Sequence, residues 1–441
     1  HYLQKINFSG DDNNTIPTDT KQLTEELRSA FRLEQFSLPR TKLLARLPLF
    51  GGFRNVLRVL RPNMHLGRKS DYRSAYDENY VNYYGFQLWK LILNTNRNNS
   101  DAMVSVDLRI FVENFGSEVW NINQDGIDIL IDYKNTVKAK EFIIKTDFSY
   151  SVMINDLEKA IDETYIEEVQ KLLMPLSILN KRPLEVISNG DPNNWAVVIN
   201  GGMQARDWLS PAALTYAISK LTWLWEANAD NMRNIDWYFL PVANPDGYQY
   251  SRLTDRLWTK NRHFDSKTGC YGVNLDRNFE FEWSKAGTSD NACNNIYCGP
   301  KKFSEPETKA MRAFMLSLKQ VMGAYVGFDA YGQAITYPWG DADYVTDNQK
   351  QLLKVAIKAM QNLRKLNEAE YRVGSSYRLK LAHSGNAADW VQQRLNPQYV
   401  YSVYLKDQGR YGFLMPPHYI VESGEEVFSF MSTIAATIGQ N

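Results

Sequence analysis

Residues 195–211, WAVVINGGMQARDWLSP, join two kinds of local structure in one short stretch. The apolar run from Trp195 to Asn200 has the length and composition of a buried strand. Two glycines end it, and Ser210-Pro211 then predicts the first turn of a helix, where proline is tolerated. Buried strands followed by amphipathic helices are typical of an α/β domain.

The same pattern continues towards the C-terminus. Apolar runs predict strands at 235–242, 324–328 and 399–405, and apolar residues at helical spacing predict helices at 210–227, 305–321 and 348–366. A last helix is expected to begin at Ser423, with Glu426 completing a capping box. From residue 183 onward the chain is therefore expected to form one large α/β domain.

A smaller α/β module is predicted at residues 84–163. Its strands are expected at 84–93, 126–133 and 149–154, and its helices at 104–115, at 136–145 and after Asn155, which we expect to be the N-cap. This order of elements suggests a small sheet with helices on one face.

The N-terminal region is polar and then strongly basic. Residues 1–20 are predicted to be a flexible lead-in, and 21–36 have helical spacing. Residues 40–73 carry nine basic residues against one acidic residue, so the rest of the neutral chain is acidic by the same amount. The basic segment is either an arm for a membrane surface or acidic partner, or an extension that folds onto the chain's own acidic face.

Composition limits the class of protein. Of the 441 residues, 44% are hydrophobic and 23% are charged, which excludes a wholly disordered chain, a collagen and a disulfide-dense miniprotein. Zero net charge argues against a general nucleic-acid binder. The sequence has no apolar run of the length needed for a membrane-spanning helix.

Cysteines and glycosylation motifs bear on the compartment. The chain has three cysteines, of which Cys270 and Cys293 bracket a loop-like segment and Cys298 is left over. Cys298 is either free, paired with a second chain or buried as a small apolar residue. Three N-x-S/T triplets begin at Asn7, Asn13 and Asn98. They are glycosylation sites of a secretory-pathway protein, or chance triplets in an Asn-rich sequence.

A colinear series of motifs then carries a specific resemblance. The stretches are 201–211 (GGMQARDWLSP), 240–250 (LPVANPDGYQY), 255–262 (DRLWTKNR), 272–282 (GVNLDRNFEFE), 297–308 (YCGPKKFSEPET), 331–340 (YGQAITYPWG), 385–390 and 407–414 (DQGRYGFL). In this order they resemble the A/B-type zinc carboxypeptidases. Residues 84–163 resemble the inhibitory prodomain of that family. The resemblance is specific because it rests on the whole series rather than on one motif. It implies a mixed central sheet flanked by helices and a disulfide between Cys270 and Cys293.

The resemblance also implies a domain plan. It consists of an N-terminal extension with a basic helical segment (1–77), a procarboxypeptidase-like prodomain (78–165), a shortened linker (166–182) and a carboxypeptidase-like domain (183–441). The family has a longer stretch, with an activation cut, where this chain has the linker. Either a segment was deleted or residues are missing there. The nearby pair Lys181-Arg182 precedes Pro183, which usually blocks trypsin-like cleavage, so the prodomain is expected to stay attached.

The catalytic positions of the family are exchanged. Its zinc ligands, two histidines and a glutamate, correspond to Gln204, Asp207 and Asp329, and none of the five histidines falls at a ligand position. A neutral amide and two carboxylates are poor zinc ligands, and would favour Ca²⁺ or Mg²⁺ if they bound a metal. The general-base position holds Tyr404, a phenol with an ordinary pKa near 10, and the oxyanion-stabilising arginine is replaced by Thr259.

Substrate recognition is retained in part. Arg206 is kept, and the Asn-Arg pair that holds the substrate carboxylate in the family corresponds to Asp276-Arg277. The family's mobile tyrosine corresponds to Gln392. Arg206 and Arg277 therefore line a residual carboxylate-binding pocket, or Arg277 pairs with Asp276 in a closed cleft.

These positions predict a catalytically inactive member of the family, without a cofactor, that acts as a binding or scaffold protein in the secretory pathway or at the cell surface. Its protein partner would be reached through residues 40–73 or through the residual cleft for C-terminal peptides. Two alternatives stay open. One is an unconventional hydrolase, or an enzyme that holds a hard metal, using Asp207 and Asp329. The other is a structural subunit that docks on a larger assembly through its N-terminal arm.

Overall fold

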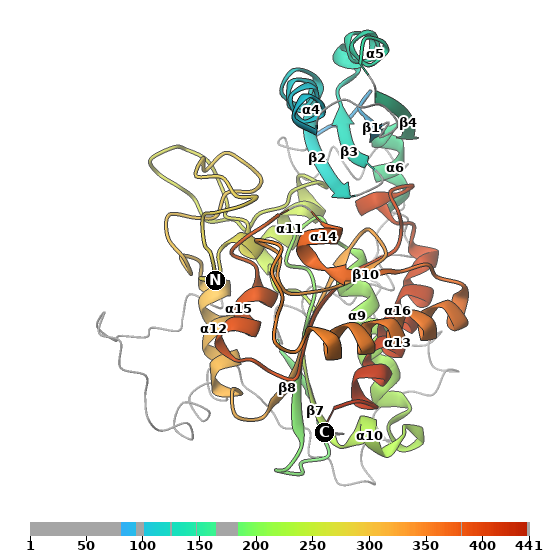
Figure 1. The fold of residues 1–441 in the computed structure, drawn as a ribbon, viewed down its shortest axis with the longest axis vertical. Coiled ribbons are helices and arrows are strands. Elements are labelled where there is room, and N and C mark those ends of the chain that lie inside the picture. The colour runs from blue at the N-terminus through green and yellow to red at the C-terminus, as the bar shows by residue number, and fades with distance from the viewer. Residues whose placement is uncertain are drawn as a thin grey trace, which may run out of the picture.

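The computed structural model describes residues 81–93, 101–123, 126–146, 148–164, 184–380 and 382–438. They form a small domain (81–164) and a large domain (184–438), and Figure 1 shows the small domain seated on one end of the large one. The expected helix at 21–36, the basic segment 40–73, the linker 166–182 and the triplets at Asn7, Asn13 and Asn98 lie outside the described residues.

The small domain is an antiparallel sheet of four strands in the order β2-β3-β1-β4. The strands are β1 (Gln87–Leu93), β2 (Gly116–Asn123), β3 (Gly126–Ile131) and β4 (Phe148–Ile154), and the helices are α4 (Asp101–Phe115), α5 (Thr136–Ile144) and α6 (Leu157–Thr164), with a 3-10 turn at Tyr133–Asn135. The predicted strands and helices are confirmed, and β2 was not predicted because its polar sequence GSEVWNIN lacks an apolar run.

The predicted N-cap of helix α6 was wrong by one residue. Asp156, not Asn155, accepts the backbone N–H of Lys159 at 3.0 Å.

The two faces of the small sheet have different partners. One face packs with α4 and α5 around Trp89, Phe111 and Ile129, which are fully buried. The other face, with Leu88 and Leu130, joins α6 in the hydrophobic core of the large domain. In Figure 1, α4 and α5 accordingly lie on the far side of the small sheet. Burial of these apolar side chains therefore stabilises the contact between the two domains, since it is the main favourable term in association.

The large domain contains a seven-stranded mixed sheet in the order β10-β9-β11-β8-β6-β7-β5. Its strands are β5 (Glu185–Ile187), β6 (Trp195–Asn200), β7 (Ile235–Leu240), β8 (Met322–Ala330), β9 (Ala334–Tyr337), β10 (Arg372–Ser375) and β11 (Tyr399–Leu405). Strands β7, β6, β8 and β11 are parallel neighbours, whereas β5 and β9 run antiparallel to β7 and β11. The mixed sheet flanked by helices that the resemblance implied is confirmed.

Helices cover both faces of this sheet (Figure 1). They are α9 (Leu209–Trp223), α10 (Asp230–Arg233), α11 (Pro245–Leu253), α12 (Pro306–Ser317), α13 (Gln349–Asn367), α14 (Ser376–Leu379), α15 (Ala387–Arg394) and α16 (Ile420–Ala435). Short 3-10 turns lie at Trp225–Ala227, Leu275–Arg277, Gly412–Leu414 and Pro417–Tyr419. Alternate residues of β6 face opposite cores: Val197 and Ile199 pack with α9, α13 and α16, and Val198 packs with α12 and α15. This is the period-2 burial expected of a strand covered on both sides.

The start of the last helix differs from the prediction. Helix α16 begins at Ile420, so Ser423 lies inside it, with a buried hydroxyl that makes no hydrogen bond. Glu426 does not close a capping box. Its carboxylate accepts the Tyr371 hydroxyl at 2.8 Å and pairs with the Lys406 ammonium at 2.9 Å. A serine three residues before a glutamate marks an N-terminus only when the serine is outside the helix.

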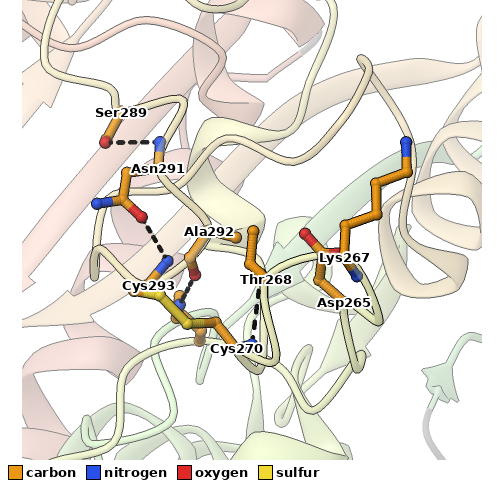
Figure 2. Close-up of a disulfide and its surroundings, with 9 residues drawn as sticks. Asp265, Lys267, Thr268, Cys270, Ser289, Asn291, Ala292 and Cys293 are labelled. Carbon is orange, nitrogen blue, oxygen red and sulfur yellow. Dashed lines mark hydrogen bonds between the residues drawn. A yellow bond between two sulfur atoms is a disulfide. The ribbon is translucent and has the colours of Figure 1, made fainter.

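The loop region after α11 is closed by the expected disulfide (Figure 2). The Cα atoms of Cys270 and Cys293 lie 5.2 Å apart, inside the usual range for a disulfide. Backbone N–H groups of both cysteines are bonded to nearby side chains, Thr268 and Asn291. Cys298 is free and buried, and burial raises the pKa of its thiol, so it is a structural rather than a reactive cysteine.

We expect Gly424→Ala to destabilise the large domain. An added Cβ would lie 2.3 Å from Cδ1 of the Tyr216 ring, where α16 packs against α9. The free energy of unfolding should fall by about 1–3 kcal/mol, the usual cost of overpacking. Urea unfolding measures this, with Val421→Ala on the exposed face of α16 as the matched control. Equal stability of the two variants would contradict the close packing of these helices.

Candidate functional site

The positions of interest meet at the carboxyl ends of β6, β8 and β11, here called the carboxyl edge. Gln204 and Asp207 follow β6, Asp329 is the next-to-last residue of β8, and Tyr404 lies in β11. Tyr404 and Asp329 are direct register partners on adjacent parallel strands. Carboxyl ends of parallel strands are where α/β proteins place their sites, because loops from several strands converge there.

The Asp207 carboxylate has a structural role, because it accepts hydrogen bonds from the chain itself. Its carboxylate is 1% exposed and accepts the Ser210 backbone N–H at 3.1 Å, the Ser210 hydroxyl at 2.8 Å and the Ala330 backbone N–H at 2.7 Å. The carboxylate therefore satisfies donors in the first turn of α9 and at the end of β8. Burial raises the pKa of Asp207 to about 6, and these hydrogen bonds oppose the rise. Both oxygens are engaged by protein donors.

Asp329 and Tyr404 share an acidic environment. Burial and the nearby carboxylates of Asp276 and Asp207 raise the pKa of Asp329 well above its usual range. Burial, together with Asp329 and Asp276, likewise raises the pKa of the Tyr404 phenol. A phenol with a raised pKa keeps its proton near neutral pH, so Tyr404 is unsuited to take a proton from water.

A lysine that the sequence reasoning missed lies among these groups. Lys380 is the C-cap residue that follows α14, and its Nζ atom lies 3.8 Å from the ring centroid of Tyr404. The ammonium donates to the Tyr331 carbonyl at 3.3 Å and to Oδ1 of Asn121, in the small domain, at 3.2 Å. Burial lowers the pKa of Lys380 to about 7, while Asp329 and Asp128 oppose the fall. Its only signal in the sequence was a single lysine between two leucines.

The two arginines expected to bind a carboxylate already have acidic partners. The Arg277 guanidinium contacts the Asp276 carboxylate at 3.1 Å and donates to the Asp276 and Gly287 carbonyls. This is the self-paired arrangement. Gln392, which the resemblance predicts for the position of the mobile tyrosine, is buried, and its side-chain amide donates to Oδ1 of Asn396, just after α15, at 2.7 Å.

Arg206 is held by the small domain. It forms an ion pair with Glu118 of β2, and its guanidinium stacks 4.1 Å from the ring centroid of Phe413. Glu118 also accepts the Asn295 amide at 2.9 Å, so one small-domain carboxylate bridges two loops of the large domain. Ion pairs of this kind, partly desolvated and backed by a stacked ring, hold more strongly than exposed ones.

A second polar contact lies in the same interface between the small and the large domain. Asp128 of β3 is 1% exposed and accepts the Tyr331 hydroxyl at 2.8 Å, with Lys90 at 3.4 Å. Trp120 packs edge-on against Phe413 with ring centroids 5.4 Å apart. The small domain therefore covers the carboxyl edge with buried polar and aromatic contacts.

Thr259 is buried and brings no positive charge to the edge. The Thr259 carbonyl accepts the Ala205 backbone N–H at 3.0 Å, which fixes the loop beside Gln204. Behind it, the Asn261 amide donates to Glu305 at 2.7 Å and to Glu307 at 3.2 Å. Burial and the adjacent Glu305 raise the pKa of Glu307 to about 7. The loop thus rests on a buried acidic network.

These donors do not fit a catalytic zinc. Zinc requires three N/O donors free to point at one ion, with an open fourth position. Asp207 has both oxygens engaged by protein donors, Gln204 offers a neutral amide, and the Lys380 ammonium lies over the ring of Tyr404, the register partner of Asp329. In the part of the chain that the structure describes, no group of three or more His, Cys, Asp or Glu side chains is arranged to hold a metal ion.

The fold and the arrangement of the edge define a carboxypeptidase-type α/β protein, and comparison with known proteins agrees. The family model described as zinc carboxypeptidase matches residues 175–430. Carboxypeptidase B of Astacus astacus is 34% identical over 250 residues, covering 56% of this chain and 82% of that protein. Carboxypeptidase O of Bos taurus is 32% identical over 280 residues, covering 62% of this chain and 74% of that protein. The chain belongs to the zinc carboxypeptidase family.

A solved structure extends the likeness to the small domain. The crystal structure of thrombin activatable fibrinolysis inhibitor has a TM-score of 0.71 at 22% identity, covering 81% of this chain and 100% of that chain. Since the large domain makes up a smaller share of the chain than this, the shared fold includes the small domain. Among the described helices, none has the length and apolar character needed to cross a membrane.

The Glu307 network predicts a pH dependence of stability. Folded Glu307 holds its proton up to about pH 7, whereas the unfolded chain releases it near the ordinary pKa of 4.5. The folded state therefore binds more protons in this window, and its stability falls as pH rises through it. Glu307→Gln should remove this part of the fall, on the order of 2–3 kcal/mol between pH 4.5 and 8.

Urea unfolding of wild type and variant across that pH range provides the measurement. The exposed Glu370→Gln is the matched control and should leave the profile unchanged. Parallel profiles for wild type and Glu307→Gln would mean that Glu307 has the same pKa in the folded and the unfolded chain.

Proposed function

We propose that this chain is an inactive carboxypeptidase-like protein that acts as a binding or scaffold protein in the secretory pathway or at the cell surface. The observation that carries the proposal is the state of the carboxyl edge. At the ligand positions stand an amide and two carboxylates, one of which is bonded to the backbone of α9 and β8. At the general-base position stands Tyr404, a phenol whose pKa is raised by burial, with the Lys380 ammonium over its ring.

The proposal includes a prodomain that stays in place. Arg206, Tyr331 and Lys380 of the large domain each contact the small domain through a polar partner. Together with the shared apolar core, they favour a domain pair that is not separated by activation. The boundaries 78–165 and 183–441 are part of this proposal.

The alternative of a carboxylate pair that performs acid–base chemistry finds less support. Such a pair needs two carboxyl groups that both face a substrate. The Asp207 carboxylate instead accepts three hydrogen bonds from Ser210 and Ala330. Of the carboxyl groups that raise the pKa of Asp329, Asp207 is bonded in this way and Asp276 is paired with Arg277.

Purified native protein is expected to contain substoichiometric zinc after dialysis and to release no C-terminal residue from peptide substrates. Zinc is measured by mass spectrometry of the metal, and release by chromatography of the products. An active zinc carboxypeptidase of the same family, assayed in parallel, establishes that both assays detect the activity. Stoichiometric zinc together with trimmed peptides would refute the proposal, and trimming without zinc would favour the carboxylate-pair alternative.

The basic segment 40–73 is the proposed contact for an acidic partner or surface. Nine basic residues in this span give an electrostatic attraction that weakens with salt. A variant with these nine residues changed to Gln should lose retention on an anionic column at low salt, whereas changing nine basic residues of the large domain should lower retention less. Equal retention of both variants would indicate that the segment folds against the chain's own acidic face.

A further inference from the structure

Helix α5 of the small domain carries apolar side chains on the face that points away from its own core. Ile144 is 82% exposed and Val137 is 65% exposed, and Tyr133, in the 3-10 turn that leads into the helix, is 53% exposed. Among the residues that the structure describes, no large apolar side chain is more exposed than Ile144. Single exposed apolar side chains are common, but a group of them on one element marks an interaction surface.

The spacing of these residues places them on one stripe of the helix. Val137 and Ile144 are seven residues apart, which is close to two helical turns, so both lie on the same face of α5. The other face holds Ala139 and Ile143, which are buried in the core of the small domain. Because a surface helix normally has one apolar and one polar face, the packing of the domain does not account for the second apolar stripe.

Lysines surround this stripe. Four of them are exposed: Lys134, Lys138, Lys140 and Lys145. Residues 132–145 carry these four lysines against two acidic residues, Asp132 and Glu141, so the net charge of the segment is +2. Glu141 has a lysine three residues before it and another four residues after it, which helical spacing places one turn away on either side. The exposed face of α5 therefore combines aliphatic side chains with positive charge.

The position of α5 leaves this face accessible. Figure 1 shows the helix at the end of the small domain that is farthest from the large domain. A flat surface can therefore approach the stripe without meeting the large domain. The strongly basic segment 40–73 precedes the same domain in the sequence, and seven residues separate Arg73 from Val81, the first residue that the structure describes. Both basic parts of the chain are thus joined to the small domain.

The combination of aliphatic and basic side chains favours one kind of anionic partner. In a bilayer, the boundary between headgroups and acyl chains accepts apolar side chains to a depth of about 5–10 Å, while anionic headgroups attract lysines. A soluble polyanion, such as a sulfated glycan, attracts the lysines but offers no apolar region to Val137 and Ile144. The exposed aliphatic stripe therefore indicates a lipid surface.

We propose that α5, together with Tyr133, docks the small domain on a membrane surface that contains anionic lipid. Ile144 and Val137 enter the boundary between headgroups and acyl chains, and the surrounding lysines contact the anionic headgroups. This goes beyond the proposed function, because it assigns the surface that meets the membrane and holds equally for an active and for an inactive large domain.

Sedimentation of the full chain with vesicles tests the assignment. With vesicles of phosphatidylcholine and phosphatidylserine, Ile144→Ser should lower the partition coefficient about tenfold and Val137→Ser about threefold, because less apolar surface leaves water. Val421→Ser, at an exposed position of α16 in the large domain, is the matched control and should bind like wild type. Urea unfolding should be the same for all these variants, since the side chains are exposed, and this separates lost binding from lost fold.

The lysines are tested with a paired change. Lys138→Gln with Lys145→Gln should lower binding to the same vesicles about tenfold at low salt, and added salt should reduce the difference. The exposed pair Lys354→Gln with Lys358→Gln in α13 is the control and should have a smaller effect.

Two outcomes would overturn the assignment. One is vesicle binding by Ile144→Ser and Val137→Ser that equals binding by wild type, which would leave segment 40–73 as the sole contact. The other is retention on immobilised heparin that falls in the lysine variant while vesicle binding stays unchanged, which would indicate a soluble polyanion. Zinc content and peptide trimming of the same samples bear only on the proposed function, so the two proposals fail separately.

Discussion

Charge balance at the carboxyl edge is the constraint on which the rest of this structure depends. The fold places Asp207, Asp276 and Asp329 close enough for the other two to raise the pKa of Asp329, and Asp128 of the small domain contacts the neighbouring Tyr331. In a low-dielectric setting each must be paired, bonded or protonated. Asp207 is bonded to backbone N–H groups, Asp276 is paired with Arg277, and burial raises the pKa of Asp329 and so favours its protonated form.

Retention of the scaffold and exchange of the catalytic groups have separate physical causes. Gly247, for example, lies where an added Cβ would be 2.3 Å from the Lys260 carbonyl, so the backbone path itself requires glycine. Nothing comparable constrains the side chain of Gln204 or Tyr404, which need only be compatible with the volume and charge at the edge. The fold of this family therefore depends on the strands, their cores and the glycine turns rather than on the particular side chains at the carboxyl edge.

Much of the fold could be predicted from the sequence. The long apolar strands β6 and β11 and the helices α9 and α13 have strong periodicity and were placed within a few residues, except that α9 ends four residues before its predicted limit. Strands β2, β5, β9 and β10 were missed, because they are short or polar and owe their conformation to neighbours in the sheet. The start of α16 was misplaced since Ser423 resembles a cap locally, whereas the packing of Ile420 decides where the helix begins.

The sequence by itself determined which side chains follow and end the buried strands, and it predicted the family's ligand and base positions at Gln204, Asp329 and Tyr404 from the motifs on either side of them. Only the tertiary structure decided which of them are engaged, and by what. Arg206 meets Glu118, and Lys380 meets Asn121, across more than 80 residues of chain. Such pairings depend on how two domains dock, and local periodicity and spacing carry no information about docking.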